Sequence, residues 1–269
     1  MRNIVYCYDP SQDKWTTLPP LPVKRFSLGQ VSGKLVTIGG VKKNGGKTDE
    51  VYTYDEQSQK WKQTIPPMPT ARRDPGVLSL QSALVAAGGF TESVVTDIVE
   101  IFRPDTLQWY KTDPLPTGCH DVSLVIIGNT CYAQGGYKRP SHLNQALYAS
   151  VDDLLGNAVP AHQTTHSGSS NTQSAWKTLP NTPTYQPAAA VLAGDLLVIG
   201  GNKTSNADKK VVYMYSFSTN SWIYIGDLPA PRSNTVAALL SSTEILVIGG
   251  WDDCGIVNTV YKGTLHLKL

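Results

Sequence analysis

Histidines paired with other polar groups are the residues of this chain whose types and spacing could support chemistry. His120 and Asp121 stand together at the start of an apolar run, where they could act as an acid/base pair. The alternative is a histidine packed in a core. His162 and His166 are four residues apart, but neither a helix nor a third ligand accompanies them, so no metal site is predicted.

The cysteines and the overall composition point to an ordinary intracellular protein. Cys7, Cys119, Cys131 and Cys254 are scattered, and none belongs to a Cys-x-x-Cys motif, so four reduced thiols are expected. The first residues lack the apolar stretch of a signal peptide, and no apolar run approaches the roughly 18 residues that span a bilayer. A net charge of +2 gives no support for a nucleic-acid partner. We therefore expect a cytoplasmic protein that binds neither membranes nor nucleic acid.

Glycine doublets at the ends of apolar runs show how the chain is organised. There are five, at Gly39-Gly40, Gly88-Gly89, Gly135-Gly136, Gly200-Gly201 and Gly249-Gly250. Tryptophans follow the first four, at Trp61, Trp109, Trp176 and Trp222. A feature repeated at this spacing indicates a ring or stack of equivalent units.

Each unit predicts four short strands. The first follows a proline-containing connector, the second ends in the glycine doublet, the third carries aromatic residues in alternation, and the fourth begins at the tryptophan. Proline cannot donate a hydrogen bond to a strand ladder, so the connectors separate one sheet from the next. No segment of useful length has a helical period, and the chain is therefore predicted to be all-β.

The combined pattern of apolar strand, Gly-Gly, aromatic strand, Trp and Leu-Pro-x-x-Arg resembles the kelch repeat over essentially the whole chain. The residue three positions after the connector proline is Arg25, Arg72 and Arg232 in three units, but Cys119 and Gln186 in the others. The resemblance implies a single kelch β-propeller domain over residues 1–269, with four-stranded antiparallel blades around a channel.

The number of blades follows from the inner strands. Five first and second strands are found, but six third strands, because residues 4–9 and 259–264 both fit the third-strand pattern. We expect five blades, with the fifth closed by pairing of the C-terminal strands with an N-terminal strand around Trp15. The alternative is six blades, one of them incomplete.

Loops at one face of the propeller are the expected binding surface, because loops on a rigid scaffold usually carry recognition. Basic residues outnumber acidic ones in the loops after the glycine doublets and in the connectors, which suggests a protein or acidic peptide as partner. The predicted partner-binding residues are Arg25, Arg72, Arg73, Tyr137, Lys138, Arg139, Arg232 and Trp251. The alternative is that the arginines brace the blades and that the two aromatic residues cover blade edges.

An insertion lengthens one loop between a third and a fourth strand. It covers residues 151–175 and should lie on the face opposite the glycine-doublet loops. Asp152–Leu155 is expected to form one helical turn, and the low complexity of residues 163–174 suggests flexibility.

Two classes of function fit the kelch resemblance. It favours a non-catalytic interaction module without a cofactor, as in substrate-recognition subunits of ubiquitin ligases and actin-associated kelch proteins, although no BTB or F-box segment is visible. The alternative is an epimerase or metal-dependent enzyme with its site at the channel mouth, for which His120 and Asp121 are the best acid/base candidates.

Overall fold

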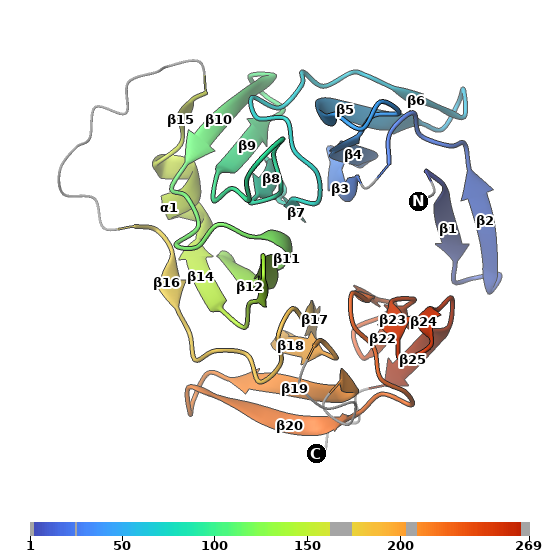
Figure 1. Ribbon diagram of the computed structural model, residues 1–269, viewed down its shortest axis with the longest axis vertical. Helices are drawn as coiled ribbons and strands as arrows, with labels where there is room; N and C mark the ends of the chain where they lie inside the picture. Colours follow the sequence, from blue (N-terminus) through green and yellow to red (C-terminus); the bar gives the residue numbers. More distant parts are fainter. Residues whose placement is uncertain (1–2, 25, 162–173, 203–208, 265–269) are drawn as a thin grey trace. The chain divides into compact units, whose positions relative to one another are not determined.

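A computed structural model describes residues 3–24, 26–161, 174–202 and 209–264, and these residues are almost entirely in β-strands (Figure 1). Its contacts group into two compact units. Unit 1 comprises Met1–Asp121 with Asp153–Ala175, and unit 2 comprises Val122–Asp152 with Trp176–Leu269. No helix in the described ranges is both long and apolar enough to cross a membrane.

Unit 1 contains an N-terminal hairpin and two blades. The hairpin is β1 (Val5–Asp9) with β2 (Lys14–Leu18). Blade 1 consists of β3 (Ser27–Val31), β4 (Lys34–Val41), β5 (Lys47–Asp55) and β6 (Lys60–Lys62). Blade 2 consists of β7 (Gly76–Ser79), β8 (Leu84–Ala87), β9 (Val99–Arg103) and β10 (Gln108–Thr112).

The remaining three blades follow the same antiparallel order. Blade 3 consists of β11 (His120–Ile127), β12 (Thr130–Lys138), β14 (Ala146–Ser150) and β16 (Lys177–Thr178), and β13 (Ser141–His142) pairs with β12. Blade 4 consists of β17 (Ala188–Leu192), β18 (Asp195–Ile199), β19 (Val211–Ser216) and β20 (Ser221–Asp227). Blade 5 has β21 (Val236–Leu239), β22 (Glu244–Ile248) and β25 (Val260–Thr264), and its loop forms the small hairpin β23 (Trp251–Asp252) with β24 (Gly255–Ile256).

The all-β class and the five blades are confirmed, as are the third strands predicted at residues 4–9 and 259–264, which are β1 and β25. The strand that holds Trp15 pairs with β1, where the rings of Tyr8 and Trp15 lie 5.0 Å apart between centroids, and β25 pairs with β22. The predicted closure of the fifth blade would join the two units and stays a prediction.

The glycine doublets are required by the close approach of two backbones. Gly88 and Gly200 both have positive φ, 64° and 61°. A Cβ on Gly88 would collide with the carbonyl oxygen of Cys119, and one on Gly200 with that of Arg232. The second glycine of each pair donates its N–H to that same carbonyl, at 2.8 Å from Gly89 and 2.9 Å from Gly201. Both the conformation and the space therefore exclude a side chain.

The hydrophobic core lies between successive sheets of each unit. In unit 1, Ile38 and Ile65 of blade 1 pack with Phe102 and Trp109 of blade 2. Burying an aliphatic side chain of this kind contributes about 1.5–3 kcal/mol. In unit 2, the corresponding cluster joins Ile199, Leu228 and Val247.

The first part of the insertion has regular structure. Helix α1 (Val151–Gly156) confirms the predicted helical turn, and β15 (Val159–Pro160) adds a fifth strand to blade 2 by pairing with β10. Thr112 donates a 2.7 Å hydrogen bond to the carbonyl of Leu154. Residues 163–174, which were predicted to be flexible, lie outside the described residues except for the last position, and so does His162.

Candidate functional site

Backbone bridges define which connector residues are equivalent. Lys24 bridges to Val41, just as Arg73 bridges to Phe90. Val23 therefore corresponds to Arg72, so aligning Arg25 with Arg72 by counting from the proline was wrong. Arg25 lies outside the described residues. By the same bridges, the equivalent position is held by Val23, Arg72, Thr184 and Arg232, all of which are buried.

Arg72 is fully buried in blade 2. Its Nη1 lies 2.9 Å from Oε2 of Glu100 on β9, and its Nη2 donates a 3.1 Å hydrogen bond to the carbonyl of Ala86 on β8. Thr70 donates a 2.7 Å bond to the other oxygen of Glu100. Burial lowers the pKa of Arg72, and the charge of Glu100 opposes that shift. With 0% of both side chains exposed, Arg72 braces its own blade and does not reach a partner.

Arg232 occupies the same position in blade 5 and is 2% exposed. Its Nη2 donates to Thr259 Oγ1 at 2.5 Å and to the Tyr261 hydroxyl at 2.8 Å, and the guanidinium lies 5.0 Å from the centroid of the Tyr261 ring. Asp252 is its nearest carboxylate, at 3.5 Å. The expectation that Arg72 and Arg232 face a partner is therefore not met by the geometry, which fits the bracing alternative.

Two loop cations of unit 1, Arg73 and Lys47, are paired with carboxylates. Arg73 is bonded to Asp74 and lies over the ring of Phe90, 4.6 Å from its centroid. Lys47 pairs with Glu92 at 3.4 Å and lies 5.6 Å from the same ring. The charge of this part of the loop face is thus largely compensated within the chain.

His120 and Asp121 meet in space. Nδ1 of His120 lies 2.7 Å from a carboxylate oxygen of Asp121, and the imidazole packs edge-on against Phe90. Asp74 adds a third potential ligand within 4.8 Å, but its carboxylate also bonds Arg73. His120 is buried, as the packed alternative predicts, and the compensating guanidinium makes the group a poor cation site.

Unit 2 brings a connected set of polar and aromatic side chains to its loops. The ring of His142 packs 4.8 Å from that of Tyr137, and its Nδ1 lies 2.8 Å from Oε1 of Gln186 and 3.3 Å from Nδ2 of Asn202. Tyr185 bridges to Asn202 through both backbone hydrogen bonds, at 3.0 and 2.7 Å. Blades 3 and 4 thus share a cluster that also includes Lys138 at the end of β12 and Arg139 in the turn that follows, and we call this set the blade 3–4 loop cluster.

Exposure distinguishes this cluster from Lys47 and Arg73 of unit 1, whose side chains are each 16% exposed. Lys138 and Arg139 are exposed, and no carboxylate of the described residues lies within ion-pair distance of either. Tyr185 is 39% exposed, and Trp251, in the next loop of unit 2, is 49% exposed. Large aromatic groups held at the surface by backbone bridges are typical anchors for a partner.

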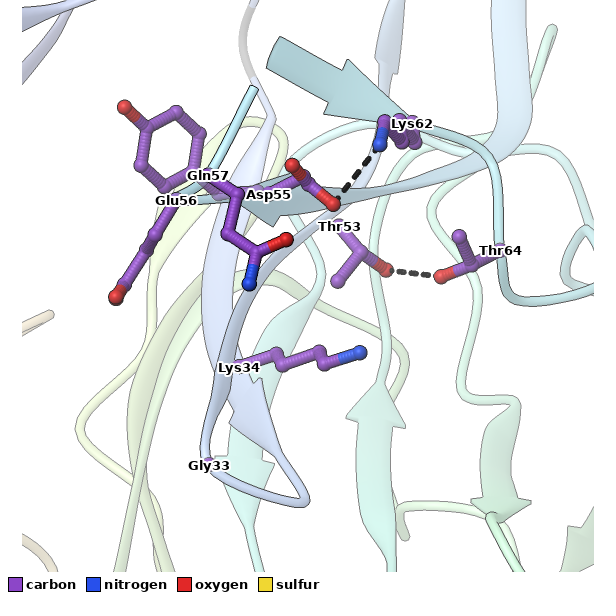
Figure 2. A pocket seen from close by; sticks show the side chains of 9 residues that line it. Gly33, Lys34, Thr53, Asp55, Glu56, Gln57, Lys62 and Thr64 are labelled. Carbon is purple, nitrogen blue, oxygen red and sulfur yellow. Dashed lines mark hydrogen bonds and ion pairs between the residues drawn. The ribbon is translucent and has the colours of Figure 1, made fainter. Parts of the chain in front are cut away.

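A separate polar cavity of about 370 Å³ lies by the turns of blade 1 (Figure 2). Lys62 points toward Asp55, 2.9 Å away, and Thr64 donates a 2.8 Å bond to Thr53. Bonds from Ser58 and Lys62 hold the pKa of Asp55 well below its usual range. These groups satisfy one another, and Lys34 and Glu56 also line the cavity.

Sequence reasoning missed three residues of these sites. Glu100 supplies the carboxylate that is buried together with Arg72. It could have been noticed as the charged residue within an apolar third strand. His142 needed the structure, because its partner Gln186 comes from the next blade, and Tyr185 needed it because its bridge to Asn202 joins the connector of blade 4 to the loop after the glycine doublet.

Comparisons with known proteins agree with the fold. The family model described as Kelch motif matches residues 2–22 and 183–229. Kelch-like protein 25 of Xenopus tropicalis is 27% identical over 245 residues, and that of Homo sapiens is 26% identical over 241; each alignment covers 86% of this chain and 37% of the relative. Kelch-like protein 40 of Xenopus tropicalis is 31% identical over 137 residues, which cover 50% of this chain and 22% of the relative.

A solved structure, "Structure of YjhT", superposes with a TM-score of 0.76 at 14% identity, covering 99% of this chain and 90% of the other. At that identity the likeness shows the fold alone. The chain spans about 37% of the length of the kelch-like 25 relatives that it matches. The blade topology and the solved structure agree on a β-propeller fold, and the matched motif and these relatives show that the chain is similar to kelch-repeat proteins.

Proposed function

We propose that this propeller is a non-catalytic interaction module that binds an acidic peptide or an acidic segment of a protein through its glycine-doublet loops. The contact residues in unit 2 are Tyr137, Lys138, Arg139, Tyr185 and Trp251. The observation that carries the proposal is the contrast in pairing. The exposed cations of the blade 3–4 loop cluster have no carboxylate partner among the described residues, whereas Lys47 and Arg73 of unit 1 do.

Chemistry at this surface suits a carboxylate beside an apolar anchor. Arginine can bind a carboxylate through two parallel hydrogen bonds, and lysine supplies a point charge. Tyr185 and Trp251 offer flat surfaces with little conformational freedom to lose. An acidic segment with apolar residues between its charges would use both features.

The kelch-like relatives support this class of function by analogy, and the same analogy extends to partners such as ubiquitin-ligase substrates or actin-associated proteins. We propose the cytoplasm as the place of action, because none of the four cysteines forms a disulfide and two of them, Cys7 and Cys254, are exposed. The enzyme alternative rests on His120 and Asp121, whose neighbouring Asp74 is already bonded to Arg73.

The test is a library of short peptides in which every Asp/Glu-rich member has a twin with Asn and Gln at the same positions. The full chain should bind acidic members more tightly than their twins, and added salt should weaken that binding. The double substitution Lys138→Glu/Arg139→Glu should weaken acidic binding roughly tenfold or more.

A charge-matched control is Lys60→Glu/Lys177→Glu, which reverses two exposed lysines on β6 and β16. It should leave the affinity unchanged. Equal binding of acidic and neutral twins, or an equal loss in the control, would refute the proposal.

A further inference from the structure

The last strand of a sheet has one unpaired backbone edge, and blades 1 to 3 protect that edge. In blade 1, β6 has only three residues, and two of them are the exposed lysines Lys60 and Lys62. In blade 3, β16 is two residues long and begins with Lys177. In blade 2, β15 covers β10, and its Pro160 has no N–H to donate. Short strands, lysine and proline all discourage pairing with another chain.

The fourth strand of blade 4, β20, has none of these features. It is seven residues long and contains no lysine, arginine or proline. Ile223, Tyr224 and Ile225 are 43%, 54% and 39% exposed. A long apolar edge strand of this kind is a template for another strand.

β20 lies inside the part of the chain that the structure describes. It follows β19 through the turn at 217–220 and leads into the connector at Leu228. Among the described residues β20 pairs only with β19, so it ends the sheet of blade 4 (Figure 1).

The fold accepts an added strand at the equivalent edge of blade 2. There β15 pairs antiparallel with the fourth strand β10, with Val159 opposite Lys111. The N–H of Ala161 donates to the carbonyl of Trp109 at 3.1 Å, and Ala161 also packs against the core cluster of unit 1. A fourth strand can therefore be extended by one more strand without disturbing the blade.

The sequence of β20 is complementary to itself in the antiparallel direction. Its ladder with β19 is regular up to Tyr224, where a bulge follows, and Ile223 lies at the centre of the apolar part of this regular segment. The one charged residue of β20, Asp227, lies outside that segment and is 2.9 Å from Lys210. Antiparallel pairing of two copies about Ile223 therefore brings no like charges together. The facing pairs are Ile223 with Ile223, and Trp222 with Tyr224.

We propose that the free edge of β20 is a homodimer interface, in which β20 of one copy pairs antiparallel with β20 of a second copy. Cross-strand pairs of β-branched residues and of aromatic residues stabilise such a contact. A two-fold axis at Ile223 gives both copies the same contacts and joins the two four-stranded sheets into one. The contact is small, so the dimer is weak. The loop residues of the proposed function take no part in it.

The test is the oligomeric state of the full chain, measured by sedimentation equilibrium at increasing protein concentration. The average mass should rise toward that of a dimer and no further, because a closed two-fold contact uses up the edge of β20 in both copies. Ile223→Lys places two ammonium groups opposite each other at the axis and should weaken association at least roughly tenfold. Ile223→Val keeps a β-branched side chain and should dimerise as the wild type does.

A matched control introduces the same charge at another exposed apolar residue. Leu107→Lys, in the turn after β9, replaces a leucine that is 59% exposed, and it should dimerise normally. Lys138→Glu/Arg139→Glu should also dimerise normally, which separates this proposal from the loop-face function. Hydrogen exchange gives a second readout, since the amides of β20 should exchange more slowly at high protein concentration in the wild type but not in Ile223→Lys.

A wild type that stays monomeric at every concentration, an unchanged dimer in Ile223→Lys, or an equal loss in Leu107→Lys would overturn the proposal. A monomer that instead binds an unrelated strand-forming peptide at β20 would assign this edge to a different partner and would equally contradict self-pairing.

Discussion

Blades 2 and 5 carry an arginine at the same buried connector position, but they neutralise it in different ways. In blade 2 the partner on the third strand is Glu100, so a full ion pair is buried. In blade 5 the corresponding residue is Tyr261, which offers a hydroxyl and a ring face, and Asp252 stands farther away. The same arginine therefore makes one blade depend on a buried charge and the other on hydrogen bonds.

Both arginines lie inside the scaffold, and this separates structural cations from those available for binding. Blade 1 shows that the connector position does not require a charge, because Val23 occupies it and packs in a cluster with Tyr52. The requirement at this position is a pair of side chains, one from the connector and one from the third strand, that pack against each other. Exposed cations such as Lys138 and Arg139 belong to a different class.

The largest expected effect comes from breaking the buried pair. Glu100→Ala should destabilise the protein by about 3–5 kcal/mol, because it leaves the Arg72 charge buried without compensation. Chemical denaturation measures the free energy of unfolding. A loss below about 1 kcal/mol, the size expected for the partly exposed pair of Glu244 with Lys262, would show that the buried pair is not special.

A double substitution sharpens the same point. Arg72→Met/Glu100→Leu removes both charges together, and it should be clearly more stable than Glu100→Ala. If the double variant is the less stable of the two, the buried charge is not the cause of the loss.

Arg232→Met should have a smaller effect, about 1–3 kcal/mol, because it removes hydrogen bonds to Thr259 and Tyr261 without leaving an unpaired buried carboxylate. The same denaturation measurement applies. A loss equal to that of Glu100→Ala would erase the distinction between the two blades.

A still smaller effect concerns Tyr52, which holds the third-strand position in blade 1. Burial, followed by the bond to Glu50, raises its pKa from 10.0 to about 12. Since the folded pKa is the higher one, this contribution to stability is complete below pH 10.0 and is lost as pH rises toward about 12. Melting temperatures of wild type and Tyr52→Phe should converge over that range; a constant gap would contradict the assignment.

Cysteine labelling tests burial at the connector position without changing stability. Cys119 of blade 3 is buried, as is Cys131, whose pKa burial raises to about 12. An alkylating reagent should modify Cys7 and Cys254 quickly and the buried pair slowly. Mass spectrometry of the native protein gives the rates, and fast modification of Cys119 would show that its connector is exposed.

The fold was predictable because the repeat imposes the same backbone geometry at every glycine doublet. The burial of Arg72 was not, since its partner Glu100 lies on a strand that comes much later in the chain. Counting from the proline also misaligned Arg25, because the connector of blade 1 is two residues shorter before its bridge at Lys24.

The loop residues also differ in what predicts them: some follow from a local sequence motif, and others depend on contacts between blades. The position of Tyr137, Lys138 and Arg139 after a glycine doublet predicts a loop, but β12 continues through Lys138 and only Arg139 lies in the turn. The contact of His142 with Gln186 depends on the packing of two blades, which no local pattern encodes.

The most direct test of the account compares Arg232→Met with Arg139→Glu in the same two assays, unfolding free energy and affinity for the acidic peptides of the twin library. We predict that Arg232→Met lowers stability and keeps the affinity, whereas Arg139→Glu keeps stability and loses affinity. The reverse pattern, with affinity lost in Arg232→Met at unchanged stability, would contradict the division between bracing and binding cations.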